Sequence, residues 1–147
     1  MYISFIIIIS CLLVDQLTKL FARRKLKDNK TIKINNNLKL YYVENSGGAN
    51  GLFSGNYFIL IFSTVLSLFV CLLLYKYYDL ENNLIFSISL SVLIGGILGN
   101  FIDRIVFSYV TDFISVRIKK KALPIFNFAD VFIFIGTIFT LVSYLIF

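Results

Sequence analysis

The stretch Leu84–Arg104, LIFSISLSVLIGGILGNFIDR, indicates which class of fold the chain adopts. It has no charged residue up to Ile102, which is close to the length of about 20 apolar residues that a helix needs to cross a bilayer. Backbone groups without hydrogen bonds cannot face lipid, so such a segment crosses as a helix. The run ends on Asn100, Asp103 and Arg104. The stretch therefore predicts a transmembrane helix with polar side chains gathered at one end.

The composition extends this interpretation to the whole chain. Its 147 residues are 59% hydrophobic and 15% charged, whereas a soluble domain is about half apolar and a quarter charged. One small core cannot bury such an excess, which excludes a soluble globular protein. We expect a membrane all-α fold in a single domain, residues 1–147, with four transmembrane helices at about residues 2–22, 57–75, 84–102 and 124–147. Because Asp15 interrupts the first span and no A-x-A cleavage site follows it, we expect this span to be retained rather than removed as a signal peptide.

Four spans bring the polar residues to one side of the membrane. The end of the first span, the start of the second, the end of the third and the start of the fourth must share that side. The polar residues found there are Asp15, Gln16, Lys19, Asn45, Asn100, Asp103, Arg104, Asp112, Asn127 and Asp130. This one-sided polarity predicts an active site at one membrane surface.

The two long loops on this side have the patterns of β-strands. Residues 31–34 and 38–41 alternate between apolar and polar side chains around Asn35–Asn37, which is typical of a hairpin. Residues 110–118 alternate as well, and Asp112 falls on their apolar face. We therefore expect a small sheet lying on the membrane surface.

Two spacings predict how the helices are used. Asn127 and Asp130 are three residues apart and are expected to share one face of the fourth helix, about one turn inside the membrane boundary. Gly95 and Gly99 form a small-xxx-small pattern, which favours close approach of a neighbouring helix.

The ionisable residues near the helix ends allow more than one interpretation. Lys19 and Arg104 either extend to the membrane surface or pair with Asp15 and Asp103, and a role in contacting the substrate carries about equal weight. A carboxylate has a short side chain that cannot reach far toward the membrane surface. For Asp112 and Asp130, a functional role is therefore favoured over a purely structural one.

The residue types that are present restrict the chemistry. The chain has no His, which excludes a Ser-His or Cys-His nucleophile and removes the usual zinc ligand. Cys11 and Cys71 lie in apolar runs without neighbouring ligand residues, and Lys19 has no Ser one or two turns away for a Ser-Lys dyad. The remaining candidates are Asp112 and Asp130. Two carboxylates that share a site cannot both ionise readily, so one can donate a proton while the other accepts one. This is aspartic-protease chemistry, which needs neither a metal nor a cofactor.

A second class of protein could use the same residues. A small proton-coupled transporter also places aspartates within the membrane. Transporters, however, carry such groups near the bilayer midplane, often on broken helices related by a repeat. Here the acidic residues gather at one surface and no repeat is evident, so we prefer the peptidase.

Five motifs, in this order along the chain, resemble those of the bacterial lipoprotein signal peptidase family, the type II signal peptidases. They are D-Q-x-x-K at Asp15–Lys19, N-x-G-x-A at Asn45–Ala49, G-N-x-x-D-R at Gly99–Arg104, V-x-D-F at Val110–Phe113 and F-N-x-A-D at Phe126–Asp130. Each motif is weak by itself, but the ordered set is specific and extends over essentially the whole chain. One departure is visible, since Asn50 stands where the family usually has an aromatic residue, and Phe53 follows three residues later.

The resemblance implies a fold, an activity and a set of site residues. The fold would be four transmembrane helices with a small extracytoplasmic β cradle. The activity would be cleavage of diacylglyceryl-modified prolipoproteins immediately before the lipidated cysteine, with Asp112 and Asp130 as the catalytic pair. Supporting or substrate-contacting roles are implied for Asp15, Asn45, Asn100, Arg104 and Asn127. The expected partners are the lipidated prolipoprotein and membrane lipids, without nucleic acid, and the expected state is a monomer.

Charge and resemblance disagree about the orientation in the membrane. Twelve Lys and Arg residues lie outside the predicted spans on the active-site side, against Lys76 alone on the other. The positive-inside rule would place the twelve in the cytoplasm. The resemblance implies a multi-pass protein of the bacterial cell (inner) membrane whose active site faces the extracytoplasmic side. We follow the resemblance, because five ordered motifs are more specific than a bias in charge.

Overall fold

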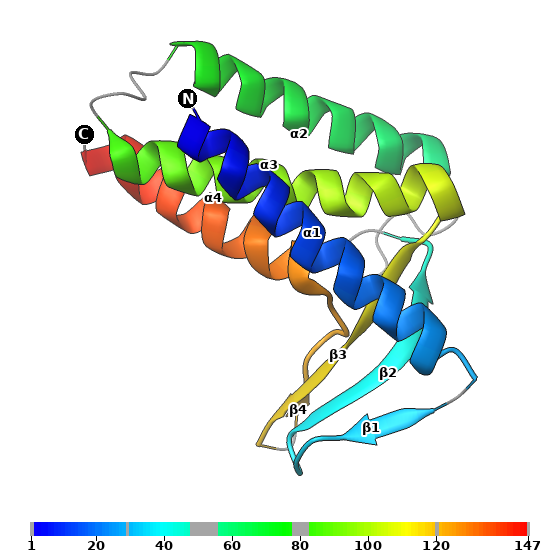
Figure 1. Ribbon diagram of the computed structural model, residues 1–147. Coiled ribbons are helices and arrows are strands. Elements are labelled where there is room, and N and C mark those ends of the chain that lie inside the picture. The colour runs from blue at the N-terminus through cyan, green and yellow to red at the C-terminus, as the bar shows by residue number, and fades with distance from the viewer. Residues whose placement is uncertain (1, 29, 48–55, 78–82, 120, 147) are drawn as a thin grey trace.

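Four long helices and a small four-stranded sheet make up the computed structural model, which describes residues 2–28, 30–47, 56–77, 83–119 and 121–146 (Figure 1). The helices are α1 (Tyr2–Lys25), α2 (Tyr57–Tyr77), α3 (Leu84–Phe107) and α4 (Phe128–Ile146). The strands are β1 (Thr31–Lys33), β2 (Leu38–Asn45), β3 (Val110–Ile118) and β4 (Lys121–Ala122). Each helix is long and apolar enough to cross a membrane, so the predicted membrane fold with a small sheet is confirmed.

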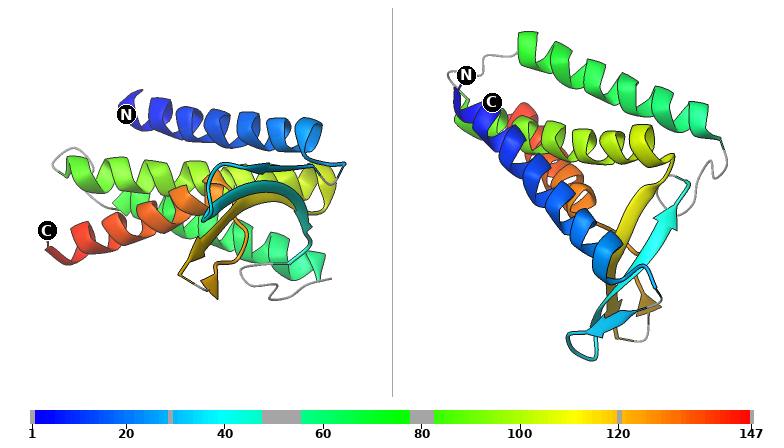
Figure 2. Two further views of the ribbon diagram at one scale, coloured as in Figure 1. Left: turned by 90° about the horizontal axis from the view of Figure 1, so that it is seen from below. Right: turned by 45° about the vertical axis from the view of Figure 1, so that its right-hand side comes forward.

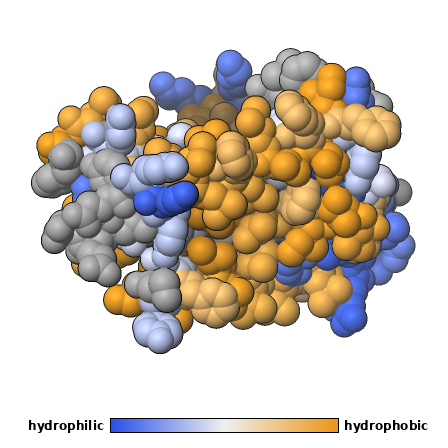
Figure 3. Space-filling model, turned by 90° about the horizontal axis from the view of Figure 1, so that it is seen from above, coloured by the Kyte–Doolittle hydropathy of each residue, from blue (hydrophilic) through white to orange (hydrophobic). Residues whose placement is uncertain are grey.

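Helix α3 lies at the centre of the bundle. Of its most apolar window 56% is buried, against 17% to 22% in the other three helices. The apolar side chains that remain exposed form a broad hydrophobic surface over the helices, with hydrophilic side chains at its edges (Figure 3). This is the surface that a lipid environment would cover.

Glycines allow α3 to approach both neighbouring helices. A Cβ atom added at Gly95 would lie 2.7 Å from the Cβ of Cys11 on α1, and one added at Gly99 would collide with the carboxylate of Asp15. A Cβ atom added at Gly136 on α4 would lie 2.6 Å from the backbone nitrogen of Leu93. The predicted packing role of Gly95 and Gly99 is therefore confirmed, and it is this close approach that brings α1, α3 and α4 together at the polar end.

The sheet has the strand order β1-β2-β3-β4 and is antiparallel throughout. The predicted hairpin is present, with Ile32 opposite Leu40. Apolar side chains of β3 pack against the end of α1, where Ala22 and Leu26 form a buried cluster with Ile114. The sheet therefore projects sideways from one end of the bundle, while both chain termini lie at the other end (Figures 1 and 2).

Four helix boundaries differ from those predicted by two residues or more. Helix α1 continues to Lys25, α2 to Tyr77 and α3 to Phe107, so each extends beyond the predicted end of its span. Helix α4 begins at Phe128, four residues later than predicted, so Asn127 precedes the helix. The prediction that Asn127 shares a helical face with Asp130 was therefore wrong.

Candidate active site

Asp112 and Asp130 are brought to the same end of the bundle by two different elements. Asp112 lies on β3, and its side chain is buried, with 3% of the residue exposed. Asp130 is in the first turn of α4 and lines a cavity between α2, α3 and α4.

Asn127 caps α4 and fixes the position of Asp130. The backbone N–H of Asp130 donates to Oδ1 of Asn127 at 2.9 Å, and the backbone N–H of Asn127 donates to Oδ2 of Asp130 at 3.1 Å. This reciprocal arrangement is a capping box, which satisfies backbone N–H groups that a helix start leaves without partners. The carboxylate of Asp130 is thus held by the start of its own helix.

Two asparagine side chains connect the two carboxylates, and a third binds Asp112 alone. The amide Nδ2 of Asn127 donates to Oδ1 of Asp112 at 2.6 Å and to Oδ1 of Asn100 at 3.2 Å. Asn100 in turn donates from Nδ2 to Oδ1 of Asp130 at 2.9 Å. The amide of Asn45, on β2, donates to the other oxygen of Asp112 at 2.9 Å. The structure therefore places three of the predicted supporting residues in direct contact with the aspartate pair.

The surroundings of Asp112 favour its protonated form. Burial, as the largest cause, and the nearby charge of Asp130 together raise the pKa of this carboxyl to about 6. Hydrogen bonds from Asn45 and Asn127 and the charge of Lys19 act in the opposite direction but are smaller effects. At a pH near 6 the pair can therefore hold one proton, as acid and base catalysis by two carboxylates requires.

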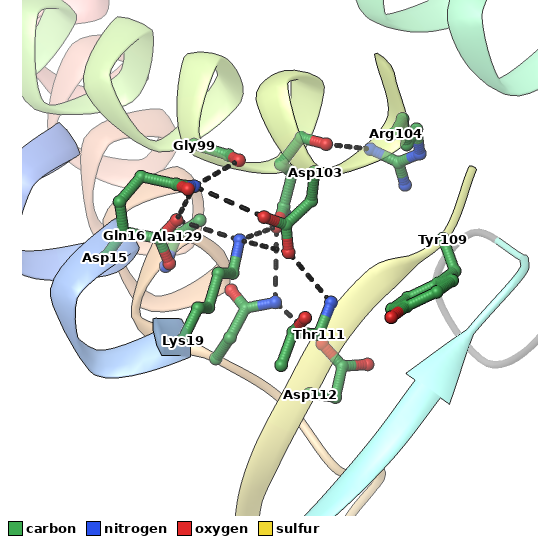
Figure 4. A network of polar contacts seen from close by, with 12 residues as sticks. Asp15, Gln16, Lys19, Gly99, Asp103, Arg104, Tyr109, Thr111, Asp112 and Ala129 are labelled. Atoms are coloured by element: carbon green, nitrogen blue, oxygen red, sulfur yellow. Dashed lines mark hydrogen bonds and ion pairs between the residues drawn. The ribbon is translucent and has the colours of Figure 1, made fainter. Parts of the chain in front are cut away.

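Lys19 is the centre of a buried network beneath this pair (Figure 4). Its Nζ lies 2.8 Å from Oδ2 of Asp15 and 3.5 Å from Oδ2 of Asp103, and all three side chains are 0% exposed. Nζ also donates to Oδ1 of Asn100 at 2.9 Å. Because Oδ1 of Asn100 accepts from Lys19, its Nδ2 points toward Asp130. Of the interpretations left open for Lys19, the structure shows pairing with Asp15 and Asp103.

Asp15 connects α1 to the start of α4. Its Oδ1 accepts from the backbone N–H of Ala129 at 2.9 Å, which satisfies a second free N–H group of this helix. With Lys19 on the other carboxylate oxygen, both oxygens of Asp15 have partners. This geometry favours a supporting role for Asp15 over contact with substrate.

Sequence reasoning did not anticipate the contacts that join α1, α3 and β3. Arg23 Nη1 lies 3.3 Å from Oδ1 of Asp103 and 2.9 Å from Oγ1 of Thr111, and the backbone N–H of Thr111 donates to Oδ2 of Asp103 at 2.9 Å. The amide of Gln16 donates to the carbonyl oxygen of Gly99 at 3.0 Å. The spacing of four between Asp15 and Lys19 indicated part of the network, whereas no sequence pattern marked Arg23.

Arg104 lies beside the cavity rather than in the buried network. The cavity is about 610 Å³, and its polar residues at this end are Asn100, Arg104 and Asp130. The Nη1 atom of Arg104 donates to the carbonyl oxygen of Asn100 at 3.4 Å, and its Nε has no partner among the described residues. Asp103 pairs with Lys19 and Arg23 instead, so the part of the chain that is described gives Arg104 no ion pair.

The second motif is described only in part. The amide N–H of Gly47 donates to Oδ1 of Asn45 at 2.9 Å, which orients Nδ2 of Asn45 toward Asp112. Asn50 and Phe53 lie outside the described residues. Among the residues that are described, no group of three His, Cys, Asp or Glu side chains could hold a metal ion. The site therefore offers two carboxylates, three amides and one guanidinium group.

Comparisons with known proteins agree with this geometry. The sequence model of the family described as Signal peptidase (SPase) II matches residues 7–146. The lipoprotein signal peptidase of Clostridium acetobutylicum is 42% identical over 129 residues, which cover 86% of this chain and 83% of the relative. The lipoprotein signal peptidase of Caldicellulosiruptor bescii is 39% identical over 132 residues, or 89% of this chain and 83% of the relative.

Solved structures support the same assignment. One bacterial membrane enzyme matches with a TM-score of 0.90 at 30% identity, and the match covers 99% of this chain and 88% of that chain. A second matches with a TM-score of 0.87 at 30% identity, over 99% of this chain and 94% of the other. Together with the match over residues 7–146, these similarities establish that the chain belongs to the signal peptidase II family of aspartic peptidases.

Proposed function

We propose that Asp112 and Asp130 form the catalytic pair of an endopeptidase that cleaves diacylglyceryl-modified prolipoproteins immediately before the lipidated cysteine. Family membership supports the removal of signal peptides from prolipoproteins in the membrane. The observation that carries the assignment is that the amides of Asn100 and Asn127 link the two carboxylates at the polar end of a cavity between helices.

The proposed mechanism divides acid and base roles between the aspartates. Asp130, ionised, takes a proton from a water molecule as its oxygen attacks the scissile carbonyl carbon, while the protonated Asp112 donates to the carbonyl oxygen. In the second step a proton passes from the pair to the departing amine nitrogen of the cysteine, and the C–N bond breaks. The water oxygen remains on the new carboxyl end of the signal peptide.

The other predicted residues take supporting roles in this proposal. Asn45, Asn100 and Asn127 orient the carboxylates through the hydrogen bonds described above. Asp15 acts through the start of α4, whereas Arg104, which lines the cavity, is the residue proposed to contact substrate. Because all these residues come from one chain, we propose that a monomer is active.

The transporter is not supported as an alternative. The family that matches residues 7–146 is a peptidase family. The aspartate pair also lies at one end of the bundle, where β3 meets α4, rather than halfway along the helices.

The direct test is cleavage by the purified protein. We expect the protein in detergent to release the signal peptide from a diacylglyceryl-modified prolipoprotein, also in the presence of a metal chelator, and to leave the unlipidated precursor intact. Mass spectrometry of both products identifies the cut. Cleavage at another bond, or equal cleavage of the unlipidated precursor, would contradict the proposal.

The proposed orientation places the active site outside the cell, with both termini in the cytoplasm. Of the twelve cations counted against this orientation, Arg23, Arg24, Lys25 and Arg104 lie within helices rather than in loops. Most of the remaining positive charge belongs to the sheet and its turns, where it is part of a folded unit.

Thiol labelling in intact cells tests this orientation. In a Cys11→Ala, Cys71→Ala background, we expect Lys121→Cys to react with a membrane-impermeant thiol reagent, because this exposed residue lies at the sheet end. The matched variant Lys76→Cys, exposed at the opposite end of the bundle, should react only after the membrane is broken. The reverse pattern would show that the charge rule predicts the orientation correctly.

The pH dependence should report the pKa of Asp112. We expect kcat/KM to fall as the pH rises through about 6, because the acid then loses its proton. The hydrogen bond from Asn45 stabilises the charged carboxylate and so lowers this pKa. Asn45→Ala removes this hydrogen bond and should therefore raise the pKa of Asp112. The alkaline limb of the plot of kcat/KM against pH should then move to higher pH by roughly one unit, since a hydrogen bond to a charged group contributes about 1.5 kcal/mol.

A neighbouring residue supplies the control for that shift. Glu44 precedes Asn45 on β2, but its exposed side chain accepts from Tyr42 and does not contact the aspartate pair. Glu44→Gln should therefore leave the pH profile in place. An alkaline limb that moves to lower pH in Asn45→Ala would overturn the assignment of Asp112 as the acid.

A further inference from the structure

The end of the sheet that is farthest from the aspartate pair carries a cluster of cations. The backbone N–H of Arg117 donates to the carbonyl oxygen of Asn37 at 2.8 Å, which places the β1–β2 turn beside the end of β3. We define the sheet tip as these two strand ends and the residues around them. Its members in this argument are Lys33, Ile34, Lys39, Arg117, Ile118, Lys119 and Lys121.

The register concentrates positive charge on one face of the sheet tip. Lys33 is directly opposite Lys39, and Lys39 is directly opposite Ser115. Arg117 is two residues beyond Ser115, so its side chain points to the same face. Like charges directly opposite each other in a sheet are destabilising unless an anion lies between or above them.

The tip has no acidic partner within the described part of the chain. The two acidic residues nearest along the sequence pair with other cations, Asp28 with Lys30 at 3.5 Å and Glu44 with Lys27 at 3.9 Å. Among the described residues, the cations of the tip make no ion pair. This charge is therefore available to an anion from outside the chain.

Apolar side chains also stand exposed at the sheet tip, on the face opposite Lys33, Lys39 and Arg117, because successive residues of a strand point to opposite faces. Ile34 is 55% exposed next to Lys33, and Ile118 is 57% exposed next to Lys119. Exposed apolar side chains alternating with lysines are typical of segments that lie in the interface between headgroups and acyl chains. A solvated acidic peptide would satisfy the lysines but not the isoleucines.

The position of the sheet also favours a membrane surface. The sheet extends sideways from the bundle at the end where α1 and α3 leave the apolar region, rather than continuing along the helix axes (Figures 1 and 2). Its tip therefore lies beyond the outline of the bundle, at the depth where lipid headgroups surround the helices.

We propose that the sheet tip binds anionic phospholipid headgroups, with its lysines and Arg117 on the phosphates and with Ile34 and Ile118 among the upper acyl chains. Positive clusters next to a membrane are attracted to anionic lipids, and the attraction weakens as salt screens it. This binding holds the sheet, and with it Asp112 on β3, at a constant depth relative to the membrane surface.

Fluorescence quenching tests this binding without using catalysis. The chain has no tryptophan, so Ile118→Trp introduces a single reporter at the tip. The variant is placed in phosphatidylcholine bilayers that contain an equal mole fraction of either brominated phosphatidylglycerol or brominated phosphatidylcholine. At low salt we expect brominated phosphatidylglycerol to quench the tryptophan about twice as strongly as brominated phosphatidylcholine, or more. This difference should shrink at high salt.

Two further variants test whether the difference in quenching depends on the cations and on the position of the reporter at the tip. Adding Lys33→Gln, Lys39→Gln and Arg117→Gln should make the two brominated lipids quench equally. Phe139→Trp, a reporter on an exposed apolar position of α4, should be quenched equally by both lipids. Cleavage is not measured, so failure of the proposed catalytic roles would leave this result unaffected.

Three outcomes would overturn the proposal. Equal quenching of the position-118 reporter by both lipids would show that the tip does not select anionic headgroups. A preference that survives the three glutamine substitutions would show that these cations are not responsible. Stronger quenching of the Phe139→Trp reporter by brominated phosphatidylglycerol than by brominated phosphatidylcholine would show that the preference does not belong to the tip.

Discussion

Replacing either Asp112 or Asp130 with asparagine is expected to reduce cleavage of a lipidated prolipoprotein by about 10³-fold or more, since general acid–base catalysis alone contributes about 10² to 10⁴. The amide has nearly the same shape as the carboxyl group, but it can neither accept a proton from water nor hand one to the leaving group. Each aspartate takes part in both steps of the proposed mechanism, so neither variant should retain half of the activity.

The structure indicates what these variants keep. The hydrogen bonds that the structure shows to Asp112 come from the side chains of Asn45 and Asn127, and Asp130 retains its backbone contacts at the start of α4. Both variants should therefore remain folded and inserted, with unfolding midpoints in detergent close to that of the unsubstituted protein. Asp28→Asn is the matched control, because this exposed carboxylate pairs with Lys30 on the surface. Turnover at the normal rate in Asp112→Asn or Asp130→Asn would refute the catalytic pair.

Replacing Lys19 with methionine is expected to destabilise the protein by about 3–5 kcal/mol, the usual cost of removing one partner from a buried ion pair. Methionine fills a similar volume, but it leaves Asp15 without its cation and Asp103 with Arg23 alone. Both carboxylates are fully buried, so water cannot replace the ammonium group.

The same substitution should also disturb the catalytic pair. Without the hydrogen bond from Nζ, Oδ1 of Asn100 keeps only the longer hydrogen bond from Asn127, so the orientation in which Asn100 donates to Asp130 is held less firmly. We expect kcat to fall even under conditions where the variant remains folded. The measurement is the unfolding midpoint in detergent together with single-turnover cleavage. Arg24→Met on the exposed side of the same helix is the control, and an equal effect of both substitutions would contradict the role given to Lys19.

Local patterns in the sequence determined the membrane fold and part of the sheet. The spans at Leu84–Ile102 and Tyr57–Tyr75 follow from unbroken apolar composition, and the hairpin around Asn35–Asn37 follows from alternation over a few residues. These features depend on neighbours along the chain and on the low polarity of lipid, so they can be derived without knowing the tertiary structure. The ordered motifs likewise sufficed to assign the chain to its family.

Helix ends depended on contacts that are distant in the sequence. Composition placed the start of the fourth span at Pro124, whereas the capping box between Asn127 and Asp130, together with the hydrogen bond from Ala129 to Asp15, sets the start of α4 at Phe128. Hydropathy could not detect this, because the residues from Pro124 are apolar enough to continue a span.

The sequence by itself determined four spans, their shared polar side, a pair of candidate aspartates and the family. Only the tertiary structure decided which polar residue meets which. It brings Lys19 between Asp15 and Asp103, and it turns the amides of Asn100 and Asn127 toward the aspartate pair. The physical reason is that the contacts of α1 with α3 and α4 join residues up to 114 positions apart, as between Asp15 and Ala129, and Gly95 and Gly99 allow the close approach of α1 and α3 that these contacts need.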